Sequence, residues 1–540
     1  MRLIVFFITT YLGYGGGLYG TYLVRMKVDN APRAATHISG NELNTMRTKG
    51  LENLSKLEKI IQLDGQKYSA QLAGPRAATG PRVKSYERYW FINSARLVMK
   101  ADLANELSKF PAIAEVVVDE PVHIDKALIT SVNYSQELVD LGISKIHESG
   151  LSGQGIRIGL IDTGLLQHKE FEKKVFAYKD FTESPSNEMH DQLGHGSHVA
   201  GLIVGDNYSG SQIGVSPKSG LVVAKVIEPV SSQGSKQKVR TRLKTFASRV
   251  LAAMQWMLDP DGNPNTKDFP QIINNSWGFP VAAPMSQNFF DRALARWREL
   301  GIIPVFAAGN EGDQGANTIS YPANSFQVIT VGAIRKNERA SFSSIGSNLL
   351  RKPDFMAPGY RLLSLKRGIN GPTYGRMSGT SMAAPLVSGL LAVIKQVDPF
   401  IGFSEVYRIL QSSSEDMGNR GWDPETGWGK VNFVNAITAS QDYLSNKISH
   451  GGKDTFKYFD HFFRKFEVTR DDYYRKQMIA LELSYMGFIK RQIKSDTAVV
   501  LKRWLHALSQ EVQRNPQVFS GLQFRVSKRL NFLRLDEHSN

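Results

Sequence analysis

The sequence contains no cysteine among its 540 residues. Disulfide bonds, thiol nucleophiles and cysteine-ligated metals are therefore excluded, and the fold has to be held by packing alone. Zinc-finger spacing and the aromatic-basic motifs of nucleic-acid-binding modules are also missing. Lysine and arginine exceed acidic residues by 66 to 50, and this excess favours anionic surfaces such as lipid headgroups. We predict a basic protein with no nucleic-acid partner.

No repeat of fixed period is present either. The chain is too long for one ordinary hydrophobic core, which predicts roughly two to four domains. With 41% hydrophobic and 10% aromatic residues, the composition is typical of a globular protein rather than a disordered one.

We predict that residues 1–26 are a signal peptide or a membrane anchor. The segment Leu3–Val24 has no charged residue and is bounded by Arg2 and Arg25. A signal peptide would use Leu3–Leu12 as its apolar part, although no A-x-A cleavage site follows. An uncleaved anchor would use the whole segment, although its glycines and tyrosines argue against an anchor. Either alternative exports the chain as a secreted, periplasmic or membrane-tethered protein.

Residues 27–130 have the pattern of a small α+β domain. Apolar residues recur at three- and four-residue steps between Asn41 and Gln66, which predicts an amphipathic helix. After a loop rich in glycine and proline, "YWFINSARLVMK" predicts a strand, "KADLANELSKF" a helix and "AEVVVDE" another strand. The domain ends in a linker near Ile124.

Residues 131–440 alternate apolar strands with helices. Short, almost continuous apolar runs are typical of strands that are covered on both faces: "IRIGLID", "GLVVAKV", "QIINNSW", "IIPVFAAG" and "VITVGAI". Helical segments such as "GSHVAGLIVG" and "FASRVLAAMQWML" separate them. The pattern predicts an α/β fold with a parallel sheet, whose chemistry collects at the carboxyl ends of the strands.

Residues 441–540 are charged and rich in helical patterns, with basic residues in modest excess. They contain no motif that we recognise. We predict a helical extension that packs on the protein or binds a partner. The alternative is a role in binding a membrane or another surface.

Four polar residues fall where strands end or helices begin in the α/β region. Asp162 ends one apolar run, Asn310 follows another, His195 begins a helical segment and Ser381 opens a further helix. Each alone has an ordinary explanation as a cap or turn residue. Together they supply what acyl transfer requires: a serine nucleophile, an imidazole base, a carboxylate that orients the imidazole and an amide donor for the oxyanion.

Two other hypotheses stay open at this point. His195 and His198 could share a helix face around a metal ion, but no third ligand cluster is evident, and Gly196 and Gly201 indicate close backbone approach instead. A non-catalytic binding or scaffold protein is the other hypothesis, and the intact set of four polar residues argues against it.

The motifs around these residues resemble those of subtilisin-type serine proteases, or subtilases. They are "IDTG" at Asp162, "GHGSHVAG" at His195, "NNSWG" from Asn274, "AAGNEG" at Asn310 and "GTSMAAP" at Ser381. The order of aspartate, histidine and serine is also that of the family. The resemblance spans roughly Val132 to Ser440. Within the family, "INNSWGF", "MLDPDGNPNTKDFPQ" and "GWGKVN" are most similar to bacillopeptidase F-type members.

The resemblance implies an exported serine endopeptidase that acts on proteins or peptides, with a subtilisin-like parallel sheet flanked by helices. Asp162 would orient His195, His195 would act as general base and acid, and Ser381 would attack the substrate. Asn310 would complete the oxyanion hole.

The resemblance also assigns the residues that bind substrate. Ser276, Trp277 and Gly278 would line the groove and pair with an extended peptide backbone. Gly309, Glu311 and Ser320 would belong to the primary specificity pocket, where Glu311 would either favour a basic side chain or only be solvated.

The small domain resembles the subtilisin-type propeptide. It would act as a folding chaperone and intramolecular inhibitor, which the enzyme then removes itself. Cleavage would fall between residues 122 and 135, which makes residues 131–440 the catalytic domain.

The resemblance implies no required cofactor and leaves a structural calcium ion open. The family's calcium site uses a carboxylate shortly after the catalytic aspartate and a loop after the histidine-bearing helix, where Glu170 and "GDNYSGSQ" fall. Tyr208 stands where an amide ligand is expected, unless Asn207 takes that place. We therefore assign no metal ligand.

Overall fold

The structure is a computed structural model, which describes residues 19–26, 45–59, 83–119, 128–130, 136–230, 242–263, 265–266, 268–279, 286–369, 371–450, 458 and 461–462. Residues 1–18 of the expected targeting signal and most of the expected helical extension lie outside them. The chain forms two compact units, of which the first holds residues 1–146, 152–396 and 400–437.

The small N-terminal domain is built on an antiparallel sheet of order β2-β3-β1-β4. Its strands are β1 (Tyr19–Met26), β2 (Val83–Tyr89), β3 (Ser94–Lys100) and β4 (Ile113–Val118). A helix over residues 45–59, α2 (Ala101–Leu107) and the 3-10 turn η1 (Trp90–Ile92) complete it. The predicted strand "YWFINSARLVMK" is therefore shorter than expected, because its first residues form the turn.

Strand β1 corrects the expected boundary at residue 26. Tyr22 pairs with Leu97 of β3 and Val118 of β4, and Leu23 and Val24 are 0% exposed. Assigning β1 to a signal peptide or anchor was wrong, because its apolar side chains fill the core of the small domain. The prediction failed because a buried strand and a membrane segment are both apolar, and composition alone does not distinguish them.

The larger region of the first unit contains an eight-stranded sheet of order β14-β13-β12-β11-β6-β8-β7, with β15 paired to β13. The strands are β6 (Arg157–Asp162), β7 (Val175–Asp180), β8 (Gly220–Lys225), β11 (Ile272–Asn275), β12 (Ile303–Ala307), β13 (Ile329–Arg335), β14 (Glu338–Arg339) and β15 (Phe355–Pro358). All pairs are parallel except β13 with β14. Every predicted apolar run is a strand of this sheet, since burial on both faces requires apolar residues throughout.

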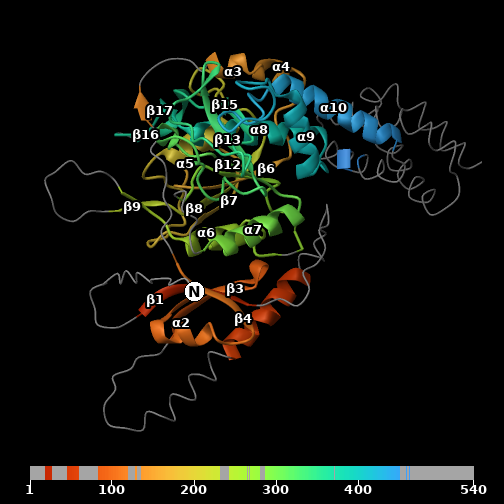
Figure 1. Cartoon of the computed structure of the whole chain (residues 1–540). Coiled ribbons are helices and arrows are strands. Elements are labelled where there is room, and N and C mark those ends of the chain that lie inside the picture. Colours follow the sequence, from red (N-terminus) through yellow and green to blue (C-terminus); the bar gives the residue numbers. More distant parts are fainter. Residues whose placement is uncertain are drawn as a thin grey trace, which may run out of the picture. The chain divides into compact units, whose positions relative to one another are not determined.

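Helices flank this sheet (Figure 1). They are α5 (His195–Val204), α6 (Ala247–Trp256), α7 (Gln287–Glu299), α8 (Thr380–Val397) and α9 (Phe403–Ser413). Among the described helices, only α8 is long and apolar enough to cross a membrane, and that stretch is entirely buried in the fold. Helix α8 is therefore a core helix.

Shorter elements connect and extend these layers. A hairpin of β16 (Leu362–Gly368) and β17 (Gly371–Ser378) leads into α8 and takes β5 (Leu128–Thr130) as a third antiparallel strand. The remaining elements are α3 (Gln136–Asp140), α4 (Ile143–Glu148), η2 (Lys169–Phe171), β9 (Glu228–Val230), β10 (Arg242–Lys244) and η3 (Gly312–Gln314).

Helix α10 (Phe433–His450) runs without a break through the expected domain boundary at residue 440. Within the second unit, the Lys447 ammonium lies 3.6 Å from the Asp398 carboxylate and 5.6 Å from the ring centre of Tyr458. The predicted boundary at residue 440 therefore falls within a helix.

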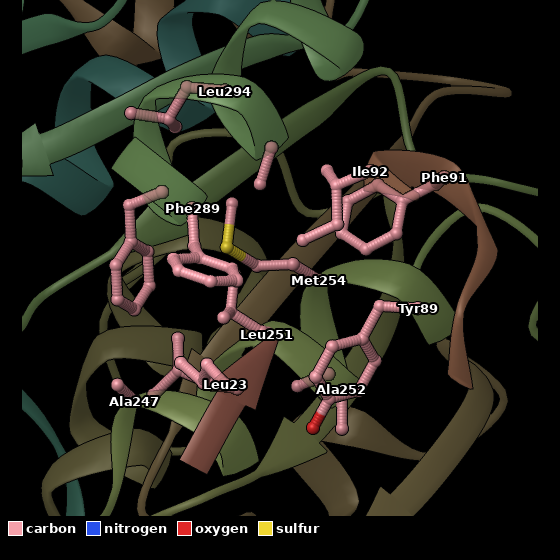
Figure 2. Close-up of a cluster of buried hydrophobic side chains, with 14 of the residues drawn as sticks. Leu23, Tyr89, Phe91, Ile92, Ala247, Leu251, Ala252, Met254, Phe289 and Leu294 are labelled. Carbon is pink, nitrogen blue, oxygen red and sulfur yellow. The ribbon is translucent and has the colours of Figure 1, made fainter. Parts of the chain in front are cut away.

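Within the first unit, the small domain packs on α6 and α7 through a buried hydrophobic cluster. Figure 2 shows Leu23, Tyr89, Phe91 and Ile92 of the small domain beside Leu251, Met254, Phe289 and Leu294 of these helices. The Tyr89 hydroxyl also donates to the Ser248 carbonyl at 2.8 Å. Asp119 accepts the Ser248 amide at 2.6 Å and so caps the first turn of α6.

Candidate active site

Polar residues gather at one edge of the central sheet. The neighbouring parallel strands β12, β11, β6 and β8 end at the same edge. Asp162 and Lys225 are the last residues of β6 and β8 and pair in register, while Ser276 and Asn310 follow β11 and β12. The predicted site residues on strands therefore converge, as the carboxyl ends of parallel strands require.

Asp162 is fully buried and contacts His195. Its Oδ1 lies 2.7 Å from His195 Nδ1 and accepts the Thr163 amide at 2.7 Å. His195 is the first residue of α5, after Gly194 with φ of 75°. Glycine adopts this left-handed conformation without strain, and a Cβ there would come within 2.6 Å of the Arg367 nitrogen. The carboxylate thus fixes Nδ1 as the nitrogen that carries hydrogen.

Asp191 is a buried carboxylate that the sequence analysis did not single out. It accepts the Gly194 and Ser197 amides at 2.8 and 2.9 Å, and the Thr163 hydroxyl at 2.8 Å. The Thr163 hydroxyl in turn accepts the Gly196 amide at 2.8 Å. This network joins the start of α5 to the loop after Asp162. An aspartate shortly before a helix was the available signal.

Lys225 was missed as well. It is 1% exposed, and its ammonium donates to the Thr163 and Ile227 carbonyls at 2.8 and 3.1 Å. Burial lowers the pKa of Lys225, while nearby carboxylates, Asp180 foremost, act in the opposite direction. A lysine inside "LVVAKV" was the available signal, because a charge in a buried strand requires partners.

Ser381 is the second residue of α8 and is 2% exposed. Its Oγ donates to the Ser276 carbonyl at 3.3 Å, and the Ser276 Oγ donates to the Ser381 carbonyl at 3.1 Å. Pro385, four residues further on, has no N–H for that carbonyl, so the Ser276 hydroxyl supplies the missing donor. Ser276 thus contacts both the hydroxyl group and the carbonyl group of Ser381 at the start of α8.

Asn310 faces the same helix start. Its Oδ1 accepts the Thr380 amide at 2.9 Å, and its Nδ2 is buried without an acceptor among the residues that the structure describes. A Cβ on Gly379 would lie 3.4 Å from that Nδ2 and 3.7 Å from the Ser381 nitrogen. The Asn310 amide and the Ser381 nitrogen therefore border one small space.

His198 takes no part in this cluster. It is fully buried, and its Nε2 lies 3.1 and 3.2 Å from the Leu362 and Gly375 carbonyls. Burial lowers the pKa of His198 to about 3, so the ring is neutral and bridges α5 to the β16–β17 hairpin. The Nε2 of His198 is thus used in contacts with the hairpin rather than with His195.

A family model described as the subtilase family matches residues 153–429, which include all the residues that contact one another at this edge. The chain belongs to the subtilase family. It is a subtilisin-type serine endopeptidase with the α/β fold of that family. The match lies within the span that the motifs predicted.

Several subtilases are similar to this chain over most of its length. Subtilisin NAT from Bacillus subtilis subsp. natto is 33% identical, over 62% of this chain and 79% of that protein. The serine protease AprX from Bacillus subtilis (strain 168) is 29% identical, over 72% and 89%. Bacillopeptidase F from the same strain is 28% identical, over 66% of this chain and 26% of that protein.

In this subtilase, four of the expected substrate-binding residues lie together. A Cβ on Gly278 would lie 2.7 Å from Ser320 Oγ, and a Cβ on Gly309 would lie 2.9 Å from both Ser320 Oγ and Glu311 Oε2. Glu311 is half-buried, and its Oε2 accepts a hydrogen bond from the Asn310 backbone N–H at 2.9 Å. The expected pocket residues thus meet beside Asn310.

Trp277 differs from the expectation that it lines the groove. The residue is 2% exposed, and its indole packs against Phe279, Phe290 and Phe306 with ring centres 5.3–6.3 Å apart. The ring belongs to the core because these aromatic neighbours, from three separate segments, enclose it. Its side chain is not available to contact a substrate.

One acidic group in the described part of the chain has metal-ligand geometry: Asp259, Asp261 and Asp268. It lies after α6, in the long "MLDPDGNPNTKDFPQ" segment, and Arg47 already contacts Asp259 at 2.7 Å. It does not include a residue of the His195 cluster.

Proposed function

We propose that Asp162, His195 and Ser381 act as a catalytic triad. The Ser381 Oγ attacks the peptide carbonyl while His195 Nε2 takes its proton, and the proton then passes to the departing amine. The resulting acyl-enzyme is hydrolysed by water, which His195 activates in the same way. Asp162 keeps the imidazole in the required tautomer, for which the 2.7 Å contact with His195 Nδ1 is the support.

The space beside Gly379 carries this proposal. A buried amide nitrogen without an acceptor in the described residues has lost its hydration without compensation, which costs about 1–3 kcal/mol. Such a donor is useful where negative charge develops during the reaction. We assign Asn310 Nδ2 and the Ser381 amide as the oxyanion hole, since both border that space.

Asp191 and Lys225 would hold this geometry. Asp191 binds the first turn of α5, which bears His195, and Lys225 binds the main chain after Asp162. Catalysis depends on such prearranged polar groups, because a shift of roughly 1 Å costs about a hundredfold in rate.

We propose that the small domain is a propeptide that inhibits the enzyme and is removed by self-cleavage. Its sheet buries apolar side chains against α6 and α7 (Figure 2). Strand β5, which lies in the predicted cleavage range of residues 122–135, pairs with β17, and Leu128 is opposite Ser378. Because Ser378 is three residues before Ser381, this pairing supports a linker that passes the nucleophile.

The substrate of this endopeptidase would pair its backbone with the chain around Ser276 and Gly278. The residue before the scissile bond would face Gly309, Glu311 and Ser320. The Glu311 carboxylate favours a basic side chain there, although it already accepts a hydrogen bond from the Asn310 backbone N–H. We further propose export, as a secreted, periplasmic or membrane-tethered enzyme, on the basis of the uncharged N-terminal segment before β1.

A paired experiment tests this function. Wild type and Ser381→Ala are expressed as full chains, and each is treated with a serine-reactive fluorophosphonate and analysed by N-terminal sequencing. We expect labelling of wild type only, with a new N-terminus between residues 122 and 135. Ser381→Ala is expected to stay unlabelled and uncut.

Equal labelling of both proteins would refute the role of Ser381. Labelling of wild type without a new N-terminus would leave the triad intact and remove the self-cleavage proposal. Activity that a chelator abolishes and that survives in Ser381→Ala would favour a metal-dependent hydrolase instead.

A further inference from the structure

The loop after α5 is where the family's structural calcium would bind. The resemblance assigns the carboxylate to Glu170 and the loop to residues 205–212. Calcium takes roughly six to eight oxygen ligands, which must be free to turn towards it. The contacts of this loop therefore show whether its oxygen atoms are free to bind a calcium ion.

Glu170 already uses both of its carboxylate oxygens. The residue is 0% exposed; Oε1 accepts the Tyr374 hydroxyl at 2.7 Å, and Oε2 accepts the Asp206 amide. The carboxylate thus binds hydrogen donors rather than facing an empty ligand position.

Lys174 brings a positive charge into the same loop. Its Nζ donates to the Val204 carbonyl at 2.6 Å and lies 2.7 Å from Asp206 Oδ2. The lysine side chain is 13% exposed, so solvent screens this pair only in part. Val204 is the last residue of α5, where a cation is favoured by the partial negative charge of the helix end.

At Tyr208 and Gln212 the loop also departs from a cation site. Tyr208 is 55% exposed and offers no amide oxygen. The Gln212 side chain donates its Nε2 to the Gly205 and Gly214 carbonyls at 2.6 and 2.9 Å. Loop carbonyls that would suit a cation therefore accept hydrogen from the protein itself.

We infer that the Lys174 ammonium replaces the family's structural calcium in this chain. Lys174 neutralises Asp206 and caps the C-terminal end of the helix that carries His195. Glu170 stabilises the loop by accepting hydrogen bonds from the Asp206 amide and the Tyr374 hydroxyl. A calcium ion in this loop would have to displace these donors and would be repelled by the ammonium. The loop is thus held without a metal, and this inference does not depend on the proposed catalytic roles.

Thermal unfolding of the full chain tests the inference. Ser381→Ala serves as the background so that self-digestion does not interfere, and unfolding is followed with a chelator and with excess calcium chloride. We expect the same Tm in both, within about 1 °C. Adding Lys174→Met should lower the Tm by roughly 3–8 °C in either condition. The matched control is Lys173→Met, which removes the same charge from an exposed neighbour and should change little.

The outcomes distinguish a loop held by Lys174 from a loop that binds calcium. A Tm that calcium raises by several degrees, with the rise abolished by Asp206→Asn or Glu170→Gln, would place an ion in this loop and overturn the inference. Equal stability of the Lys174→Met and Lys173→Met proteins would also overturn it. A calcium response that survives both loop substitutions belongs to another site, such as the group around Asp259, and is compatible with the inference. Calorimetric titration with calcium counts the sites independently, should a loop variant fail to fold.

Discussion

Two buried regions of the first unit differ in how they are held. At the carboxyl edge of the sheet, Asp162, Asp191 and Lys225 are almost fully buried. Each of them holds a nearby residue through a short polar contact: His195, Gly194 and Thr163, respectively. On the outer face of α6 and α7, the small domain is held chiefly by apolar side chains, with a few polar contacts such as Tyr89 to Ser248.

The difference matches what each region has to do. Hydrogen bonds between buried groups are directional, and an unpaired partner is costly, so they define positions to fractions of an ångström. Apolar burial depends on area and tolerates small shifts, which suits a domain that is to be released. Small polar changes should therefore damage the first region most, and losses of apolar volume the second.

The largest effect is expected for Asp162→Asn. An asparagine keeps the shape but no longer holds His195 in the required tautomer, so kcat should fall about ten-thousandfold. Steady-state kinetics on a peptide substrate measures this fall, and the Tm serves as the control for folding. A loss of less than tenfold in a well-folded variant would contradict the proposed role of Asp162.

Asn310→Ala should have the next largest effect. It removes the Nδ2 donor beside Gly379, and kcat should fall about a hundred- to a thousandfold, a magnitude carried over from subtilisin itself rather than derived for this chain. The KM should change much less, because the donor acts on charge that develops only in the transition state. A rise in KM with an unchanged kcat would mean that Asn310 binds the substrate in its ground state instead.

Phe91→Ala should weaken the apolar contact of the small domain. Phe91 is 1% exposed in the shared cluster, and its truncation costs roughly 3–5 kcal/mol. We expect a lower yield of folded protein and a faster loss of inhibition after cleavage. Phe110→Ala is the matched control, because Phe110 of the same domain is 38% exposed. Equal yields from the two variants would argue against a chaperone role for this contact.

His198→Gln should have the smallest effect at neutral pH and a clear one in acid. The pKa of His198 is about 3 in the fold, against 6.5 for the ordinary side chain, so the unfolded chain binds a proton that the folded one does not. The stability that His198 contributes above pH 6.5 is thus lost progressively as the pH falls towards about 3. Glutamine keeps a donor for the Leu362 and Gly375 carbonyls but does not titrate. Urea unfolding of Ser381→Ala at about pH 7 and about pH 5 should show a flatter decline with His198→Gln.

Much of the fold was predictable from the sequence because it is encoded locally. Strands such as β8 and β11 are continuous apolar runs, and α5 and α6 were predicted as helical segments. The predictions that failed depended on contacts between segments that are far apart in the sequence. Tyr19–Val24 continues the uncharged N-terminal segment, and only its pairing with β3 and β4 identifies it as part of a strand.

The candidate site was predictable in its chemistry, because nucleophile, base, carboxylate and amide are identities that short motifs preserve. The residues that support the site were not predictable. Asp191 and Lys225 both bind Thr163, and this residue is about thirty to sixty positions away from them in the sequence. The same applies to Trp277, whose ring packs against Phe290 of α7 and Phe306 of β12.

By itself, the sequence determined that the chain has no disulfides, that its apolar runs are the strands of a parallel α/β sheet, and which residues are candidates for catalysis. Tertiary structure alone decided that β1 belongs to the small domain and that Asn310 Nδ2 and the Ser381 nitrogen border one space. It also decided that Lys174 reaches Asp206 and Val204. The physical reason is the same in each case: side-chain identity sets which interactions are possible, whereas distance and burial between remote segments select those that form.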